Sequence, residues 1–292
     1  MAVDGLIVID KPAGWTSHDV VGRARRLAGT RKVGHAGTLD PMATGVLVLG
    51  VGRATRLLGH LALSTKGYDA TIRLGQATVT DDAEGDVVVT ADASGVERAA
   101  LDSAVAELTG DIGQVPSAVS AIKVKGERAY KRVRAGEDVA LSARPVTVSQ
   151  FTVSAVRRQC SVVDVDVHVE CSTGTYVRAL ARDVGDRLGV GGHLTMLRRT
   201  RVGGYGLVDA HTLEALEERL MVVPLDEAAA VGFATYTVDD DRAAAVRNGR
   251  ALTVDLGSAG PVAVLTSTGE FLALYGQHGP VAKAVAVFPP AP

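Results

Sequence analysis

The clearest hydrophobic pattern in the chain lies at residues 162–170, where from residue 163 onward valines occupy the odd positions and Asp, His and Glu the even ones. Because successive side chains of a strand point to opposite faces, this pattern predicts a strand with one buried face. Residues 6–9 and 68–74 predict further strands, and the apolar run at 46–49 is expected to be buried. The chain therefore contains several strands, of which the one at 162–170 has the strongest signal.

Helical spacing of apolar residues is weaker and occurs in three places. One helix is predicted over residues 18–28 with Ser17 as its N-terminal cap, and another over residues 99–109. A third follows a turn at residues 173–174 and ends near Gly189. Strands outnumber helices and do not alternate with them regularly. The pattern therefore predicts an α+β fold with a mixed, mostly antiparallel sheet and flanking helices.

The last sixty residues have a different pattern from the rest. A helix is predicted over residues 240–248, followed by short strands at 262–266 and 271–275 that turn residues separate. A chain of 292 residues has room for about two domains at roughly 150 residues each. We expect a main domain over residues 1–231 and a small β-rich module over residues 232–292.

The composition excludes several classes of protein. With 47% hydrophobic and 22% charged residues, the chain matches ordinary globular proteins rather than disordered or collagen-like ones. No apolar segment reaches the ~18 residues that a membrane-spanning helix needs, and the N-terminus lacks the basic start of a secretory signal. The two cysteines are too few for a disulfide framework. We expect a cytoplasmic protein with no membrane attachment.

The net charge of −2 is a sum of opposed blocks. Residues 1–80, 121–134 and 144–201 carry net charges of +5, +5 and +4, whereas residues 81–111 carry −8 and residues 202–292 carry −6. The three basic segments together could bind a polyanion, since phosphate contacts dominate nucleic-acid affinity. The alternative is that charges of both signs mix over the folded surface.

The densest cluster of candidate chemistry is a glycine-rich loop over residues 34–45. Asp40 stands directly before Pro41, which disfavours helical geometry and holds the aspartate on an extended segment. Such a carboxylate can act as nucleophile, general base or metal ligand, or it can simply cap a turn. The glycine spacing matches neither a P-loop nor a dinucleotide fingerprint, and the histidines lack zinc-site spacing. We therefore expect no metal and no cofactor.

Other candidates stand at the edges of predicted elements. Arg178 follows the turn at residues 173–174 near a helix start, where the helix dipole favours anions, so an acidic partner or a phosphate would explain it. Tyr68 places a phenol at the beginning of a strand, and Trp15 is the only tryptophan, in a predicted loop. Each of these residues also has an ordinary packing or surface interpretation.

Four blocks follow one another in the chain: LIVIDKPAGWTSHDVV, GHAGTLDPMATGVLVLGVGRATR, SAIKVKGERAYKRVRAG and CSTGTYVRALARDVGDRLGVGGHLTMLRRTRVGGY. Together they resemble the bacterial TruB family of tRNA pseudouridine synthases, which act on uridine 55. The resemblance covers about residues 5–230, and the remainder resembles a PUA-type RNA-binding module. It implies a pseudouridine-synthase fold for the main domain.

The resemblance also implies roles for individual residues. Asp40 falls on the family's catalytic nucleophile, Tyr68 on its base-contacting tyrosine and Arg178 on its arginine partner of the aspartate. The basic segment 121–134 would belong to an RNA-clamping arm near residues 115–140. Substrate contacts fall on His35, Tyr176, Leu197, Asp82, Lys123, Lys125, Arg128, Lys131 and Arg132.

The implied reaction breaks the N1–C1′ bond of uridine, rotates the base and joins C5 to C1′. Nothing is oxidised and no group arrives from outside, which agrees with the expected absence of a cofactor. The substrate would be the T stem-loop of tRNA, with the target base flipped out and stacked on side chains. We expect a monomer with no obligate protein partner.

One segment departs from the family pattern, and two alternatives stay open. The family usually has Pro-Pro-x-Tyr-Ser-Ala where this chain has PSAVSA at residues 116–121, so one proline and the tyrosine are missing. The chain could instead be a tRNA-binding or tRNA-folding factor whose role needs no catalysis. It could also be a synthase that partner proteins direct to another RNA.

Overall fold

The computed structural model describes residues 4–117, 123–124, 127–128 and 141–288. The chain forms two compact units, each assembled from segments that are distant in sequence. The terminal unit consists of Met1–Pro41, Gly45–Leu63 and Val202–Pro292. The central unit consists of Met42–Thr44 and Ser64–Arg201.

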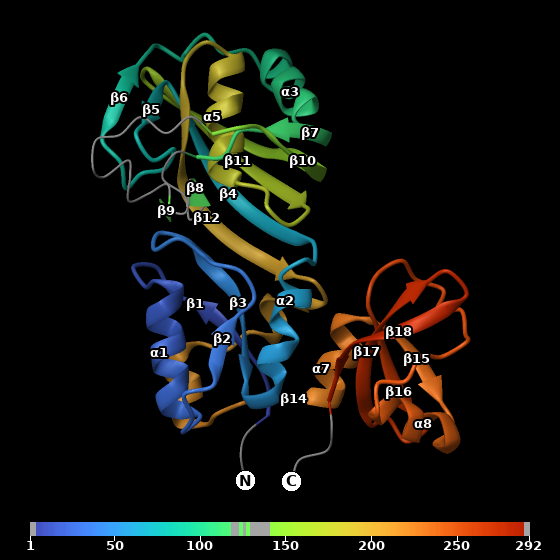
Figure 1. Cartoon of the computed structure of the whole chain (residues 1–292). Helices are drawn as coiled ribbons and strands as arrows, with labels where there is room; N and C mark the ends of the chain where they lie inside the picture. The colour runs from blue at the N-terminus through green and yellow to red at the C-terminus, as the bar shows by residue number, and fades with distance from the viewer. Residues whose placement is uncertain (1–3, 118–122, 125–126, 129–140, 289–292) are drawn as a thin grey trace. The chain divides into compact units, whose positions relative to one another are not determined.

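The central unit is built on a sheet with the strand order β12-β4-β11-β10-β7, in which β4, β11, β10 and β7 pair antiparallel (Figure 1). Helices α3 and α5 contact each other and pack against β10 and β4 respectively. A hairpin of β5 and β6 and a two-stranded pair of β8 and β9 complete the unit. Its strands are β4 (Lys66–Leu74), β5 (Gln76–Thr78), β6 (Val87–Thr90), β7 (Gly110–Gln114), β8 (Lys123–Val124), β9 (Glu127–Arg128), β10 (Arg144–Gln159), β11 (Val162–Cys171) and β12 (Gly192–Val202), and its helices are α3 (Arg98–Glu107) and α5 (Val177–Arg187).

The alternating segment forms β11, as its pattern predicts. All four valines of the predicted buried face are at most 2% exposed. The opposite face is not simply solvated, because Asp164 is also buried and receives two hydrogen bonds from Arg73 of β4, each of 2.7 Å. The polar face of the strand thus carries ion pairs that join neighbouring strands.

The terminal unit contains two sheets. The first has the order β14-β1-β3, with β2 also paired to β3, and the second is the C-terminal sheet β15-β16-β17-β18. Helix α8 packs on the C-terminal sheet, and α7 contacts β1 as well as β17. The elements of this unit are β1 (Gly5–Lys11), α1 (Ser17–Leu27), β2 (Val33–His35), β3 (Thr44–Val51), η1 (Gly52–Arg56), α2 (Leu58–Leu61), β13 (Tyr205–Gly206), η2 (Leu207–Asp209), α6 (Leu213–Glu218), β14 (Val223–Pro224), α7 (Leu225–Gly232), β15 (Ala234–Val238), α8 (Asp240–Arg247), β16 (Val262–Thr266), β17 (Phe271–His278) and β18 (Val281–Val287).

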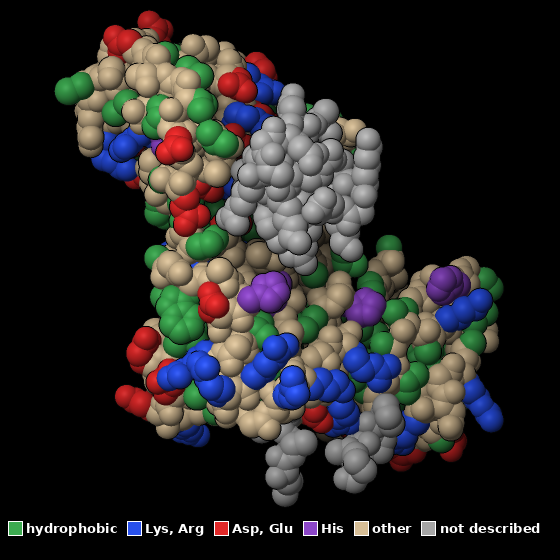
Figure 2. Space-filling model, turned by 60° about the vertical axis from the view of Figure 1, so that its left-hand side comes forward, with side chains coloured by type: hydrophobic (Ala, Val, Ile, Leu, Met, Phe, Trp, Pro, Cys, Tyr) green, Lys and Arg blue, Asp and Glu red, His purple; other side chains and the backbone are tan. Residues whose placement is uncertain are grey.

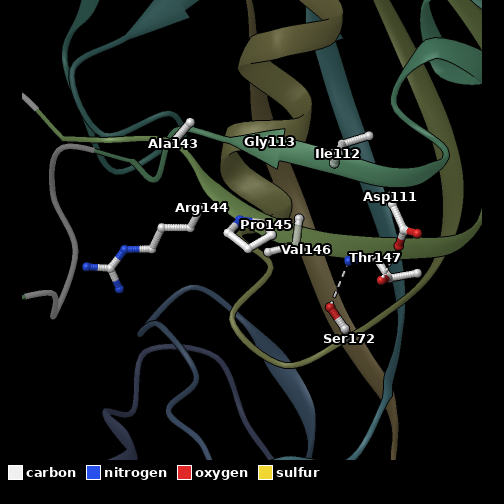
Figure 3. Close-up of a pocket in the computed structure, with 9 residues that line it drawn as sticks. All are labelled: Asp111, Ile112, Gly113, Ala143, Arg144, Pro145, Val146, Thr147 and Ser172. Carbon is white, nitrogen blue, oxygen red and sulfur yellow. Dashed lines mark hydrogen bonds between the residues drawn. The ribbon is translucent and has the colours of Figure 1, made fainter.

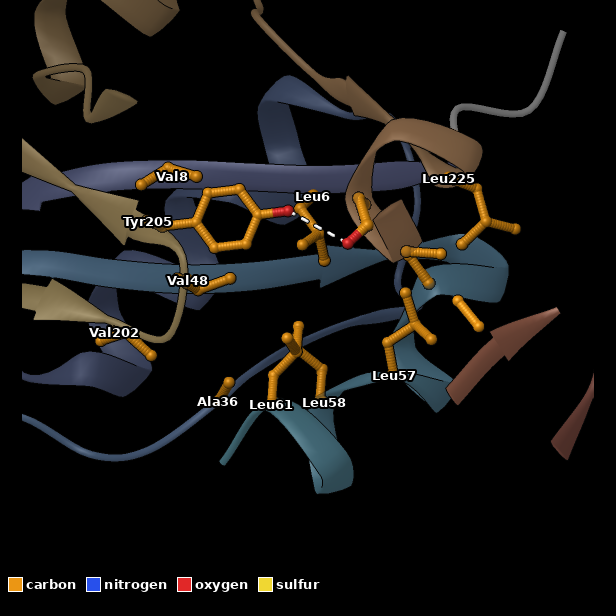
Figure 4. Packing of buried hydrophobic residues seen from close by; sticks show 14 of the residues in the cluster. Leu6, Val8, Ala36, Val48, Leu57, Leu58, Leu61, Val202, Tyr205 and Leu225 are labelled. Carbon is orange, nitrogen blue, oxygen red and sulfur yellow. Dashed lines mark hydrogen bonds between the residues drawn. The ribbon is translucent and has the colours of Figure 1, made fainter. Parts of the chain in front are cut away.

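One hydrophobic core joins the two ends of the chain within the terminal unit. Leu6 and Leu57, from the first sixty residues, share a buried cluster with Phe271 and Leu274 of the C-terminal sheet. The hydroxyl of Tyr205 lies inside this cluster and donates a hydrogen bond of 3.2 Å to the carbonyl of Ala228 (Figure 4). A second, separate cluster fills the space between α8 and the C-terminal sheet.

The cap of α1 differs from the prediction. Thr16, not Ser17, is the N-cap: its hydroxyl accepts from the backbone N–H of Asp19, whose carboxylate in turn accepts from the N–H of Thr16. Ser17 is buried and turned toward Leu39 instead. The prediction that Ser17 caps the helix is therefore wrong, because its hydroxyl has a partner elsewhere in the fold.

Within the described part of the chain, no helix is both long enough and apolar enough to cross a membrane.

Candidate active site

The loop that carries Asp40 follows β2 and is held in place by hydrogen bonds from a buried lysine. The side chain of Lys11 is fully buried at the end of β1. Its ammonium donates to the carbonyls of Pro12 (3.0 Å), Trp15 (2.7 Å) and Pro41 (3.2 Å). The last of these bonds fixes the residue directly after Asp40. Sequence reasoning gave Lys11 no role, because lysines are almost never fully buried and no local signal marks this one.

Ser17 holds the residue on the other side of Asp40. Its hydroxyl accepts from the backbone N–H of Leu39 at 2.9 Å and lies 3.1 Å from the carbonyl oxygen of the same residue, to which it donates. Both groups are buried, so these bonds have little competition from water. Asp40 is therefore held between two anchored neighbours, Leu39 and Pro41, while its own side chain is partly exposed.

His35 lies at the end of β2, five residues before Asp40 and in the same unit. Its ring makes an edge-to-face contact with His18 of α1, with 5.9 Å between the ring centres. It is partly exposed, as a residue that contacts a substrate must be.

Lys and Arg side chains gather in the terminal unit on the face shown in Figure 2. The basic cluster, as we define it, consists of Arg25, Arg26, Arg31 and Lys32, all exposed, from the end of α1 and the turn that follows it. Arg25 donates to the carbonyl of Val33 on β2 at 3.1 Å. Among the described residues, none forms an ion pair with Arg26, Arg31 or Lys32, and the charge of Lys32 lowers the pKa of the more distant Asp4 carboxyl. This cluster can accept phosphates without first breaking ion pairs.

In the central unit, Arg178 and Asp82 form a buried ion pair. Arg178 is the second residue of α5, and its Nη1 lies 3.3 Å from Oδ2 of Asp82 and donates to the carbonyl of Thr80 at 2.8 Å. The two side chains are 7% and 3% exposed. The other oxygen of Asp82 accepts from the hydroxyl of Thr80 and from the N–H of Glu84. Asp82 is thus the acidic partner that the arginine at this helix start requires.

Tyr176 is the N-cap residue of α5, but its side chain makes no capping hydrogen bond to the first turn of the helix. Instead, the buried amide of Gln114, at the end of β7, bonds both backbone groups of Tyr176. Its Oε1 accepts from the N–H at 2.8 Å and its Nε2 donates to the carbonyl at 3.1 Å. Sequence reasoning missed Gln114, because its partner is sixty-two residues away and no local motif marks it.

Tyr68 and Leu197 also belong to the central unit, on β4 and β12, which are neighbours in its sheet. Each is 7% exposed, and Tyr68 lies opposite Val169 of β11. Two residues before Tyr68, Lys66 is buried as well. Burial, together with the nearby Arg199, lowers the pKa of its ammonium to about 8.

The predicted arm contacts fall largely outside the described residues. Lys123 and Arg128 are paired across β8 and β9 by their backbones. Lys125, Lys131 and Arg132 lie outside the described part of the chain.

A hollow of about 510 Å³ lies beside β7 and the start of β10 (Figure 3). Within it, the hydroxyl of Thr147 donates to Asp111 at 2.6 Å and the N–H of the same threonine donates to Ser172 at 2.9 Å. The predicted site residues are absent from its lining, so this hollow is not the candidate site.

The predicted residues thus form two groups. The terminal unit holds Asp40 and His35, and the central unit holds Asp82, Arg178, Tyr176, Tyr68 and Leu197. The expected pairing of Arg178 with Asp40 joins the two groups and stays a prediction. Among the described residues, no three His, Cys, Asp or Glu side chains are grouped to hold a metal ion.

Three family profiles match successive parts of the chain. They are "TruB family pseudouridylate synthase (N terminal domain)" at residues 25–177, "tRNA pseudouridylate synthase B C-terminal domain" at residues 178–230 and "tRNA Pseudouridine synthase II, C terminal" at residues 233–289.

Relatives that match nearly the whole chain are also named as pseudouridine synthases. The chain is 57% identical to the tRNA pseudouridine synthase B of Arthrobacter sp. (strain FB24), across 99% of this chain and 97% of the relative. It is 61% identical to the protein of the same name from Cutibacterium acnes (strain DSM 16379 / KPA171202), across 93% and 92%. A chain of an H/ACA RNP bound to a substrate RNA containing 2′-deoxyuridine superposes with a TM-score of 0.71 at 26% identity, covering 98% of this chain and 85% of that one. The α+β fold expected from the sequence is confirmed.

Proposed function

Because the chain belongs to the TruB family of pseudouridine synthases, we propose that it isomerises uridine 55 in the T loop of tRNA to pseudouridine, with Asp40 as the nucleophile. The observation that carries this proposal is identity of 57% across nearly the whole length to a protein named tRNA pseudouridine synthase B. Catalysis is favoured over the alternative of a tRNA-folding factor, since the relatives are named as synthases.

Asp40 is suited to nucleophilic work by the rigidity of its loop. The carbonyl of Pro41 and both backbone groups of Leu39 are held by Lys11 and Ser17. A carboxylate on so fixed a segment loses little conformational freedom when it attacks, which lowers the entropic part of the barrier. The N1–C1′ bond breaks, the base turns and C5 joins C1′; the bond formed by the carboxylate of Asp40 breaks again, so that the free enzyme is restored.

Proton balance requires a base near C5 and a proton at N1. Loss of the proton from C5 restores the C5–C6 double bond of the ring, and N1 gains a proton to give the product. We assign the acceptor role at C5 to Tyr68, and in this proposal its ring also stacks on the base. The reaction is an isomerisation in which no atom is gained or lost, so we expect it to need no cofactor.

The electrostatic role belongs to Arg178. A guanidinium near Asp40 would keep the attacking carboxylate ionised, because an opposite charge favours the charged form. Asp82 restricts the movement of this arginine through their ion pair. Tyr176 and Leu197 supply apolar surface for a flipped base, and His35 contacts the flipped nucleotide.

The RNA itself is held by charge in this proposal. The basic cluster offers four exposed cations next to the segment that carries His35 and Asp40. Residues 115–140 form an RNA-clamping arm, with contacts from Lys123, Lys125, Arg128, Lys131 and Arg132. Residues 1–231 are the catalytic domain, and residues 232–292 are a PUA-like RNA-binding module. We expect a cytoplasmic monomer that acts without a protein partner.

The test compares wild type with Asp40→Asn on an unmodified tRNA transcript in EDTA, with the modified position mapped. We expect wild type to form pseudouridine at uridine 55 and the variant to lose at least about 10³-fold in rate, as enzymes without their nucleophile do. The tRNA dissociation constant should not change.

Asp102→Asn is the matched control, because this aspartate is exposed and pairs with Arg98 on the surface of α3. It should keep the wild-type rate. Near-normal turnover by Asp40→Asn would contradict the nucleophile assignment. Binding of tRNA without product from wild type would favour the folding-factor role, and product at another uridine would point to a different RNA target.

A further inference from the structure

The turn that presents Asp82 contains a backbone conformation that is rare for a residue with a side chain. Asp81 has a φ of +59°, and the described chain has only one other non-glycine residue with positive φ, Cys160. A left-handed conformation costs an ordinary residue about 1 kcal/mol or more, so neighbouring contacts must hold it. The backbone of Asp81 also bonds on both sides, to Thr78 and to Leu194.

Arg182 of α5 supplies the contact to the side chain of Asp81. Its Nη1 lies 3.3 Å from Oδ2 of Asp81, while Nη2 donates to Asp183 at 2.7 Å and to the carbonyl of Val115 at 2.7 Å. One guanidinium therefore joins three segments: the 80–82 turn, the helix and the segment that follows β7.

Arg178 stands one helical turn before Arg182, so the two side chains lie on the same face of α5. Arg178 bonds Thr80 and Asp82, and Arg182 bonds Asp81 between them. Three consecutive residues of one turn are thus held by two arginines of one helix. Displacing Asp81 must displace the residue on either side of it, and both are partners of Arg178.

Asp81 depends on this contact because it is buried. It is 9% exposed, and burial raises the pKa of its carboxyl, whereas Ser117, Arg182 and, more weakly, Arg178 act in the opposite direction. Without Arg182 the carboxylate would be left in a poorly solvated place, and the turn would relax to expose it or the carboxyl would take up a proton.

We propose that Arg182 is a positioning residue of this enzyme, which fixes the turn at Asp81 and through it the Asp82–Arg178 pair. This inference rests on the proposed function, since the pair matters for catalysis only if Arg178 acts on Asp40. It differs from a general stabilising role, because it predicts that the reaction step suffers while tRNA binding does not.

The activity test uses Arg182→Gln and Arg182→Lys, with Arg187→Gln as the matched control. Arg187 lies on the same helix and also forms an ion pair, with Glu107; its other bond goes to the carbonyl of Asp183, and no bond to the turn is found among the described residues. Single-turnover rates are measured with enzyme in excess, and tRNA affinity by filter binding. We expect Arg182→Gln to lower the rate about tenfold, as small misplacements of reacting groups do, with the dissociation constant within about twofold of wild type.

Arg182→Lys keeps the charge beside Asp81 and should recover a large part of the rate, and Arg187→Gln should match wild type. Asp81→Asn tests the pair itself: combined with Arg182→Gln, it should cost no more than Arg182→Gln alone, because both remove the same interaction. A wild-type rate for Arg182→Gln, or an additive double variant, would overturn the proposal. So would a loss of rate matched by an equal loss of affinity.

A second measurement does not depend on activity. The side-chain nitrogen signals of Arg178, assigned with Arg178→Lys, are compared by NMR in wild type, Arg182→Gln and Arg187→Gln. We expect them to shift only in Arg182→Gln, and unchanged signals would overturn the inference whatever the activity. If the signals shift but wild type makes no pseudouridine, the positioning role holds and the proposed function alone fails.

Discussion

Lys66 shows how a single buried cation affects stability. It is 7% exposed at the start of β4, donates to the carbonyl of Ser64 at 2.8 Å and has a pKa lowered from 10.5 to about 8, chiefly by burial. The folded protein therefore binds this proton more weakly than the unfolded chain does. Between about pH 8 and pH 10.5 the unfolded chain holds more protons, so the contribution of this group to the free energy of unfolding rises with pH.

We expect Lys66→Met to be more stable than wild type near pH 7, where wild type has to keep a buried charge. The interval between the two pKa values corresponds to roughly 3 kcal/mol, which is the upper limit of the gain. The difference should shrink from pH 8 and disappear by about pH 10.5. Urea unfolding of both proteins up to about pH 9 measures the start of this decline, with Lys283→Met, an exposed lysine, as control.

A constant difference at all pH values would contradict this prediction. The thiol of Cys171 titrates in the same range, because burial raises its pKa to about 11, and it has the opposite effect on stability. Because Lys66 lowers the pKa of this thiol, the two proteins are compared below pH 9, where Cys171 is protonated in both.

At the scale of elements, α5 is placed by a contact between two glycines. A Cβ on Gly185 would lie 2.1 Å from the nitrogen of Gly192, and one on Gly192 would lie 2.4 Å from the carbonyl oxygen of Ala181. The backbones of α5 and the start of β12 therefore touch directly. Since α5 carries Arg178 and Arg182, this contact fixes the position of the two arginines that hold the 80–82 turn.

We expect Gly185→Ala to destabilise the protein by about 3 kcal/mol or more, because backbone atoms cannot move aside as side chains do. Gly22→Ala is the matched control: Gly22 is also inside a helix, α1, but a Cβ there meets nothing within 4 Å. Alanine should stabilise that helix by up to about 1 kcal/mol. Thermal and urea unfolding measure the stability of both variants. If Gly185→Ala were as stable as wild type, the packing argument would be refuted.

For the whole molecule, the distribution of charge matters more than the sum. A net charge of −2 gives no long-range attraction to RNA, yet the basic cluster gathers four cations at the end of α1. Binding through such a cluster releases counterions from the RNA and therefore weakens with salt.

We expect tRNA affinity to fall as salt rises, and Arg31→Gln combined with Lys32→Gln to reduce the slope of log K against log salt by about 2. Filter binding from low to physiological salt measures the slope. Arg98→Gln, which removes an exposed arginine already paired with Asp102, should leave it unchanged. An unaltered slope in the double variant would show that phosphates do not contact the cluster.

Much of this protein was determined by the sequence alone. The strand at β11, the helix α3 and the strands of the C-terminal sheet follow from local periodicity, and the family follows from four ordered blocks of residues. These features depend on side-chain spacing within one segment, which the sequence states directly. The proposed site residues were likewise assigned from their positions in the motifs that resemble the family, without knowledge of the tertiary structure.

Only the tertiary structure decided which polar groups meet. Thr16 and Ser17 are adjacent hydroxyls with similar capping preference, and Leu39 selects Ser17 across twenty-two residues. The partner of Arg178 in the central unit is Asp82, and the partner of Tyr176 is Gln114. Such pairs are set by how the chain folds back on itself, because a buried donor or charge takes whichever partner the packing brings near. Local spacing carries no record of that choice.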